Sequence, residues 1–159
     1  MAEIFRIYIS PGHNLTKKKT EGVKYPTLSV DCVECIAGQG LTGERYFGHQ
    51  EDYKGQITFF ALETYEDLCR TFGITDKDPS VFRRNVITRG VDLNQWIGQE
   101  FEIQGISFFG TEEAAPCSWM NRVFAPGALE AMVGRGGLRA RILTDGILRT
   151  DHSVTNGGA

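Results

Sequence analysis

The alternation of apolar and polar residues along the chain predicts short strands separated by polar or glycine-rich segments. Residues 4–9 alternate well enough for a first strand, which the Ser-Pro-Gly sequence at 10–12 ends. A second strand is expected over 27–36, where β-branched and apolar residues dominate, and three glycines within 38–43 break it. Between these strands, the polar stretch 14–25 with its three consecutive lysines predicts an exposed loop.

One segment has the period of an amphipathic helix. Residues 56–62 predict a buried strand, which leads into a helix over 63–72 with Gly73 at its expected end. A further strand is expected over 81–88, followed by a short helical turn over 93–97. The apolar face of the longer helix comprises Leu62, Tyr65, Leu68, Cys69 and Phe72.

Two glycine-containing dipeptides predict hairpins in the second half of the chain. Gln104-Gly105 and Asp145-Gly146 each stand between two apolar runs, and such dipeptides suit the tight turns of two-residue hairpin loops. The expected strands are 101–103 and 106–109 for the first hairpin, and 138–143 and 147–149 for the second.

Short strands, tight turns and few helices predict a mainly β fold with a few short helices and a β-barrel-like sheet. The last two helices are expected near 118–124 and 127–133. The chain has 159 residues and shows no internal repeat or change of composition. It is therefore predicted to form one domain over 1–159, with a loose glycine-rich tail over 152–159.

The charge and hydropathy of the chain exclude some classes of partner. The net charge of −3 and the pI of about 5.6 argue against nucleic acid as a partner, because nucleic-acid binders are usually basic. No apolar run is longer than six residues, so we expect no membrane partner. The N-terminus lacks the pattern of a signal peptide, which predicts a cytoplasmic protein with reduced cysteines.

Three of the four cysteines have structural explanations. Cys32 and Cys35 have redox spacing, but residues three apart in a strand point to opposite faces, so we expect no disulfide between them. A thiol–disulfide enzyme using this pair is retained as an alternative. Cys69 lies on the apolar face of its helix and is expected to be buried there. No structural zinc site is expected, because no zinc-binding interval joins the histidines, which are His13, His49 and His152.

Cys117 is the cysteine for which a chemical role is expected. It follows Pro116 at the start of a predicted helix, where backbone N–H groups and the helix dipole favour a thiolate. Glu112 and Glu113 oppose that effect if they lie close. A thiolate here would suit a metal ligand or a sulfur carrier, and a merely capping cysteine is the structural alternative.

Arginines accompany the glycine-rich segments and one strand start. Arg45 follows the glycine-rich break, and Arg83-Arg84-Asn85 opens a predicted strand. Arginine suits phosphate because its planar guanidinium offers two parallel donors to two oxygens. Surface ion pairs are the alternative explanation for each of them. The remaining members of the set surround Gly136-Gly137 and are Arg135, Arg139 and Arg141.

Taken together, these segments resemble the molybdenum cofactor sulfurase C-terminal (MOSC) domain family in its stand-alone form. The resemblance is strongest over 38–150 and consists of five pieces in the family's order. No single piece is specific, and the evidence is their common order and spacing. The pieces are Gly40-Leu41-Thr42-Gly43-Glu44-Arg45, Arg84-Asn85-Val86-Ile87, Val91-Asp92-Leu93 through Ile97-Gly98, Gly110-Thr111-Glu112-Glu113-Ala114-Ala115-Pro116-Cys117 and Gly136-Gly137-Leu138-Arg139-Ala140.

The resemblance implies a β-rich barrel that binds the molybdenum cofactor, molybdopterin, with Cys117 as metal ligand and catalytic residue or sulfur carrier. It also implies that Arg45, Arg84, Asn85 and Arg139 bind the phosphate and pterin of that cofactor. One departure is Glu44, because the family commonly has aspartate after the glycine. Pyridoxal phosphate is not expected, because the aminotransferase-like domain of fused relatives is missing from this chain.

Two classes of function follow from the resemblance and the residues. The first is a cofactor-binding enzyme that sulfurates a cofactor or reduces N-hydroxylated compounds, with a small-molecule substrate and, for sulfur transfer, a protein donor or acceptor as partner. The second is a non-catalytic module that binds an anion or a partner. The sequence alone does not separate sulfur transfer from molybdenum-dependent reduction.

Overall fold

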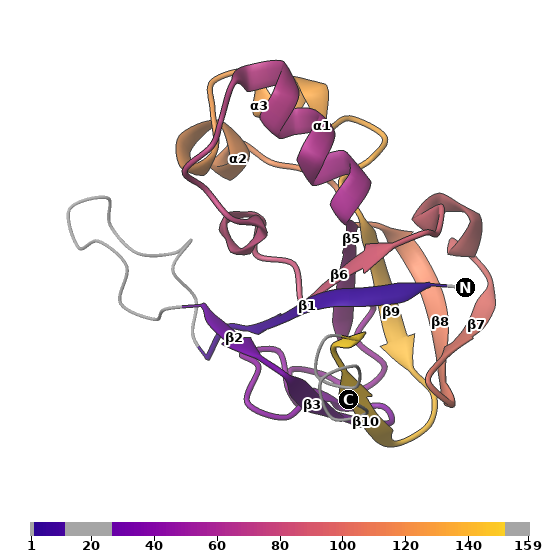
Figure 1. Ribbon diagram of the computed structural model, residues 1–159. Coiled ribbons are helices and arrows are strands. Elements are labelled where there is room, and N and C mark those ends of the chain that lie inside the picture. The colour runs from indigo at the N-terminus through magenta and orange to yellow at the C-terminus, as the bar shows by residue number, and fades with distance from the viewer. Residues whose placement is uncertain (1, 12–26, 152–159) are drawn as a thin grey trace.

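The computed structural model describes residues 2–11 and 27–151, which form two β-sheets and a group of short helices (Figure 1). The loop predicted over 14–25 and the tail predicted over 152–159 lie outside the described residues. No helix within the described part is both long and apolar enough to cross a membrane.

The larger sheet has seven strands and is mostly antiparallel. Its central strand β5 is parallel to β6 on one side and antiparallel to β9 on the other. The parallel pair is possible because α1 and the segment after it connect the two strands. In spatial order the strands are β2 (Leu28–Val30), β1 (Glu3–Ile9), β6 (Val86–Arg89), β5 (Ile57–Ala61), β9 (Leu138–Ile142), β8 (Ile106–Glu113) and β7 (Glu100–Ile103).

The smaller sheet has three strands and shares a core with the larger one. Its strands in spatial order are β10 (Gly146–Arg149), β3 (Cys32–Ile36) and β4 (Gly40–Leu41). Val33 and Leu148 from this sheet belong to the same buried cluster as Phe59 and Phe108 from the larger sheet. Buried residues therefore alternate with half-buried ones along β9 and with mostly exposed ones along β3, since only one face of each strand meets the core.

The barrel-like closure expected from the sequence is not found, because the described strands form two open sheets. The strand predicted over 27–36 divides at Asp31, so that β2 pairs with β1 while β3 joins the other sheet. The outer strands β2 and β7 of the larger sheet do not pair with each other. The mainly β class with a few short helices is confirmed.

Three helices lie together at one end of the molecule, away from β3 and β10 (Figure 1). They cover a second buried cluster, which includes Phe60, Phe82 and Phe124. The longest helix, α1, ends at Gly73, whose left-handed φ of 66° lets its N–H donate to the carbonyl of Cys69, as its position predicted. The helices are α1 (Leu62–Phe72), α2 (Trp119–Val123) and α3 (Ala128–Ala131).

The strand predicted over 81–88 is correct only in its second half. Residues Pro79–Phe82 form a 3₁₀ turn, η2, and the strand begins at Val86. Asp78 starts the turn, because its carboxylate accepts a hydrogen bond of 2.9 Å from the backbone N–H of Ser80. The apolar content of residues 81–88 resembles that of a strand, so the sequence alone did not distinguish the capped turn at Pro79–Phe82 from the strand that follows it. The short turn predicted over 93–97 is confirmed as a second 3₁₀ turn, η3 (Leu93–Trp96).

One of the two predicted hairpins forms. Gln104 and Gly105 have φ values of 53° and 82° and join β7 to β8, as expected for a tight hairpin loop. The second prediction is wrong, because β9 pairs with β5 and β8 whereas β10 pairs with β3. Asp145 contributes to this change of sheet, since its carboxylate accepts a 2.7 Å hydrogen bond from the N–H of Ala37.

Candidate functional site

Four of the residues singled out in the sequence converge on one cavity of about 170 Å³. Cys117 precedes α2, Arg45 follows β4, Arg84 lies between η2 and β6, and Arg139 lies on β9. These positions are far apart in the chain, and the sheet and the helical end of the molecule bring them together. We call this space the Cys117 cavity.

Cys117 is exposed and lines the cavity. It stands two residues before α2, and its carbonyl accepts a 3.0 Å hydrogen bond from the N–H of Met120. The predicted helix start is therefore present. The helix has only five residues, so its dipole contributes less than the sequence argument assumed. What the structure shows of Cys117 is that its side chain is accessible and shares a cavity with several cations.

Arg45 is anchored by the neighbouring carboxylate. Its Nη1 donates a 2.8 Å hydrogen bond to Glu44, and the side chains of both residues are almost fully buried. Burial raises the pKa of the Glu44 carboxyl, and the charge of Arg45 opposes that rise. The buried Nε of Arg45 has no hydrogen-bond partner among the described residues. This unpaired donor is an observation that favours an acceptor in the cavity.

Arg84 holds the walls of the cavity together. Its Nε donates to the carbonyl of Gly136 at 2.9 Å, and its Nη2 donates to the carbonyl of Ala114 at 2.8 Å. Its Nη1 donates to the carbonyl of Phe82 at 3.1 Å. Burial, followed by the nearby charge of Arg139, lowers the pKa of Arg84 to about 10, so it stays protonated at neutral pH. Arg84 is consequently a structural cation that can offer only its remaining N–H groups to a ligand.

Arg139 is the most available cation of the set. It is partly buried on β9, and within the described part of the chain its guanidinium makes no hydrogen bond or ion pair. Thr58 lies opposite it on β5 and lines the same cavity. Arg139 is therefore free to bind an anion.

Asn85 does not line the cavity. Its Oδ1 accepts hydrogen bonds of 2.9 and 3.0 Å from the backbone N–H and hydroxyl of Thr58. Its Nδ2 donates to Glu44 at 2.9 Å and to the carbonyl of Tyr8 at 3.2 Å. The structure thus places Asn85 behind the cavity, where it fixes Glu44 and, through Glu44, Arg45.

The cavity contains residues that the sequence analysis did not select. Tyr46 and Tyr53 stack with ring centroids 5.3 Å apart, and the guanidinium carbon of Arg45 lies 4.7 Å from the ring of Tyr46. His49 contacts both rings edge-on, at 5.4 and 4.9 Å. Tyr46 could have been suspected from its place beside Arg45, whereas no local pattern marks Tyr53. Together they form an aromatic wall beside the cations.

The cations of the cavity act on one another. Burial and then the charge of Arg45 lower the pKa of Arg83, which also lines the cavity. The charge of Arg139 lowers the pKa of Arg84 in the same way. Like charges held this close favour a bound anion, because it offsets their repulsion.

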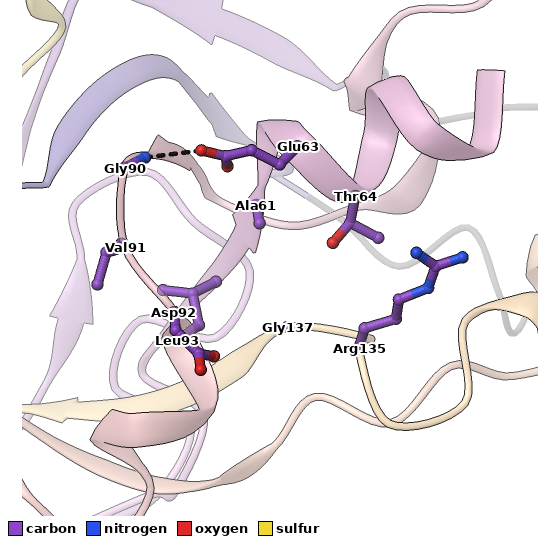
Figure 2. Close-up of a pocket in the computed structure, with 9 residues that line it drawn as sticks. All are labelled: Ala61, Glu63, Thr64, Gly90, Val91, Asp92, Leu93, Arg135 and Gly137. Carbon is purple, nitrogen blue, oxygen red and sulfur yellow. Dashed lines mark hydrogen bonds between the residues drawn. The ribbon is translucent and has the colours of Figure 1, made fainter. Parts of the chain in front are cut away.

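A second, larger cavity of about 370 Å³ lies near the start of α1 (Figure 2). Its charged residues serve the fold. Glu63 accepts a 2.8 Å hydrogen bond from the N–H of Gly90, and Asp92 accepts one of 3.1 Å from the N–H of Asn94. Arg135 pairs with Asp67 at 2.7 Å. This cavity therefore lacks the free cations of the Cys117 cavity.

The other cysteines differ from Cys117 in burial. Cys35 is fully buried and Cys32 is exposed, which confirms that the two point to opposite faces of β3. Burial raises the pKa of the Cys35 thiol to about 12, which keeps it neutral. Cys69 is only half-buried, where full burial was expected, although it packs against the cluster under the helices.

Comparison with known proteins identifies the family. A model of the MOSC domain matches residues 42–155, which is more than half of the chain. The chain therefore belongs to the MOSC domain family. No curated protein matches its sequence.

Solved structures share the fold at low sequence identity. The YUAD protein from Bacillus subtilis superposes with a TM-score of 0.75 at 17% identity, covering 94% of this chain and 92% of that one. YiiM from Geobacillus stearothermophilus gives a TM-score of 0.66 at 15% identity, covering 94% and 71%. YiiM from Escherichia coli gives 0.62 at 19% identity, covering 78% and 61%. These comparisons show that the chain shares the fold of these proteins.

Proposed function

We propose that the Cys117 cavity binds the anionic end of the molybdenum cofactor and that Cys117 acts on the metal or carries sulfur. The family is associated with this cofactor, and the observation that carries the proposal is the convergence of an exposed thiol with Arg45, Arg84 and Arg139. A phosphorylated pterin needs fixed cationic donors, and a soft metal or a sulfur atom needs a thiolate.

The residues present fit the anionic part of such a ligand. Arg45 offers a buried Nε without a partner among the described residues, and Arg139 offers its whole guanidinium. Tyr46 and Tyr53 add an aromatic wall on which a flat ring can stack. At about 170 Å³ the cavity is below the roughly 300–1,000 Å³ of most ligand sites, so it encloses one end of the cofactor and leaves the rest outside.

Cys117 has one of two roles in this proposal. As a metal ligand, the Cys117 thiolate would hold a bound molybdenum centre, which would supply the redox chemistry for reduction of N-hydroxylated compounds with electrons from a separate reductant. As a sulfur carrier, it holds the transferred sulfur as a persulfide and exchanges it with a donor or acceptor protein. No group of three or more His, Cys, Asp or Glu side chains able to hold a metal occurs among residues 2–11 and 27–151.

Titration of molybdopterin against matched variants tests the binding proposal. Arg139→Ala should weaken binding roughly ten- to hundredfold, the value of a charged hydrogen bond of about 1.5–3 kcal/mol. Arg149→Ala, an exposed arginine on β10, is the control and should bind like wild type. Equal affinity of Arg139→Ala, Cys117→Ser and wild type would leave a non-catalytic module as the better account.

Mass spectrometry separates the two roles of Cys117. If Cys117 carries sulfur, incubation with a persulfide donor should add the mass of one sulfur atom to the peptide that contains it. Cys32→Ser, which removes the other exposed thiol, should leave this addition intact. If the addition occurs only at Cys32, the sulfur-carrier role is excluded.

A further inference from the structure

A third cavity lies beside the Cys117 cavity on the same face of the larger sheet. Strand β9 presents Arg139 to one and Arg141 to the other, because Ala140 between them points into the core. Of two neighbouring loop residues, Tyr53 lines the Cys117 cavity and Asp52 lines the other one. We call this space the Arg141 cavity. Its volume of about 590 Å³ lies within the range of small-molecule sites.

A row of three side chains crosses the floor of the Arg141 cavity. The strand register sets Glu100 on β7 opposite Phe109 on β8, and Phe109 opposite Arg141 on β9. The guanidinium carbon of Arg141 lies 5.2 Å from the centroid of the Phe109 ring, a cation–π distance that fixes the arginine. A cation and an anion therefore flank an aromatic ring.

Two buried donors at this cavity have no acceptor. Gln56 is only 1% exposed, and its Oε1 accepts a 2.8 Å hydrogen bond from the N–H of Ile142. Its Nε2 has no partner among the described residues, and neither does the buried Nε of Arg141. Buried donors are rarely left unpaired, so this pair indicates a missing acceptor, and a carboxylate has two oxygens to offer.

Two carboxylates in the lining of the cavity are also unengaged. Within the described residues, the carboxylates of Glu100 and Asp52 take part in no hydrogen bond or ion pair, and both line the cavity. Leu143, which is 41% exposed, adds apolar surface next to Phe109. The cavity thus combines unpaired donors, free carboxylates and apolar surface, with Glu100 set across Phe109 from Arg141 by the strand register.

We propose that the Arg141 cavity binds an α-amino acid with an apolar side chain. The carboxylate lies on Arg141 and Gln56, the ammonium group on Glu100 and Asp52, and the side chain on Phe109. Strands β7 and β9 are separated by β8, so Glu100 and Arg141 stand on either side of Phe109 and can hold the two charged groups of one ligand. The site is independent of the proposed cofactor binding.

Calorimetric titration with three related probes tests the proposal. L-leucine carries both charged groups, L-leucinamide lacks the carboxylate, and 4-methylpentanoate lacks the ammonium group. L-leucine should bind at least tenfold more tightly than either of the other two. Absence of L-leucine binding, or equal binding of all three probes, overturns the proposal.

Two variants assign each charged group to its partner. Arg141→Gln should weaken L-leucine at least tenfold and leave L-leucinamide nearly unchanged. Glu100→Gln should weaken L-leucine to a similar degree and leave 4-methylpentanoate nearly unchanged. Glu102→Gln on the same strand and Arg149→Gln on β10 are outside the cavity and should bind L-leucine like wild type. If the two controls lose as much affinity as the two variants, the binding is not at this cavity.

Discussion

At the scale of single residues, the arginines of the Cys117 cavity have different tasks despite their proximity. Arg84 gives three hydrogen bonds to backbone carbonyls, whereas the guanidinium of Arg139 gives none within the described part of the chain. The sequence treated both as candidates for binding an anion, because a guanidinium offers two parallel donors to phosphate, and it does not show that the same donors of Arg84 are used by backbone carbonyls. Only the fold shows which acceptors are within reach.

This difference predicts unequal losses of stability when each arginine is removed. Arg84→Ala should lower the free energy of unfolding by about 3–4 kcal/mol, since it removes charged hydrogen bonds and leaves carbonyls unpaired. Arg139→Ala should lower it by less than about 1 kcal/mol. Urea unfolding of the two variants beside wild type measures both values. Equal losses would show that Arg84 is no more structural than Arg139.

The burial of the cysteines predicts an order of thiol labelling in the native protein. Cys117 and Cys32 are exposed and should react first, and half-buried Cys69 should react later. Cys35 should react only on unfolding, because it is buried and its pKa is raised to about 12. Peptide mapping after timed alkylation gives the order. Faster modification of Cys69 than of Cys117 would contradict the assignment of Cys117 as the reactive thiol.

At the scale of elements, local patterns predicted α1, η3 and the hairpin of β7 and β8, and they failed where a distant partner decides. The dipeptide Asp145-Gly146 suits a hairpin, but Asp145 bonds to Ala37 and β10 pairs with β3. A Cβ on Gly146 would also lie 2.5 Å from the Ile106 side chain, so this glycine serves close packing and has no turn role. Such contacts are set by the other strand, and a local sequence window does not contain them.

The segment between α3 and β9 contains Gly136, whose carbonyl accepts a hydrogen bond from Arg84. A Cβ on Gly136 would lie 2.3 Å from the carbonyl oxygen of Ala114, whereas one on Gly134 would meet nothing within 4 Å. Gly136→Ala should therefore cost about 2–3 kcal/mol by overpacking, against about 1 kcal/mol for Gly134→Ala, which has only a positive φ of 81° to overcome. Thermal unfolding compares them, and equal costs would argue against close packing at Gly136.

The buried thiol of Cys35 on β3 predicts that the free energy of unfolding depends on pH in the alkaline range. The folded-state pKa of Cys35 is about 12, above its ordinary value of 9.0, so between these pH values the unfolded chain loses the proton first. The free energy of unfolding should then fall as pH rises, by up to about 1.4 kcal/mol per pH unit. Cys35→Val removes this contribution, so urea unfolding between pH 8 and about 11 should show a shallower decline than in wild type. If the free energy of unfolding declines in parallel in wild type and in Cys35→Val, this contribution of Cys35 is excluded.

At the scale of the whole molecule, the larger sheet, the segment after β4 and the helical end of the molecule meet around the Cys117 cavity. The sequence predicted the β-rich class from its short strands and tight turns, and the family resemblance singled out Cys117 together with three of its arginine neighbours, although no single matching segment is specific. It did not predict Tyr53, the separation of Asn85 from the cavity or the absence of closure, since each depends on how distant strands pair. The Arg141 cavity was missed for the same reason.

The most direct test of the account is the molybdenum and pterin content of protein purified from cells that make the cofactor. Wild type should contain both, and Cys32→Ser should match it, since Cys32 is exposed on β3 and does not line the cavity. Cys117→Ser should retain much of the pterin and lose metal ligation or sulfur transfer, while Arg139→Ala should lose pterin. If wild type contains neither molybdenum nor pterin, or if all four proteins contain the same amounts, the cavity is not a cofactor site.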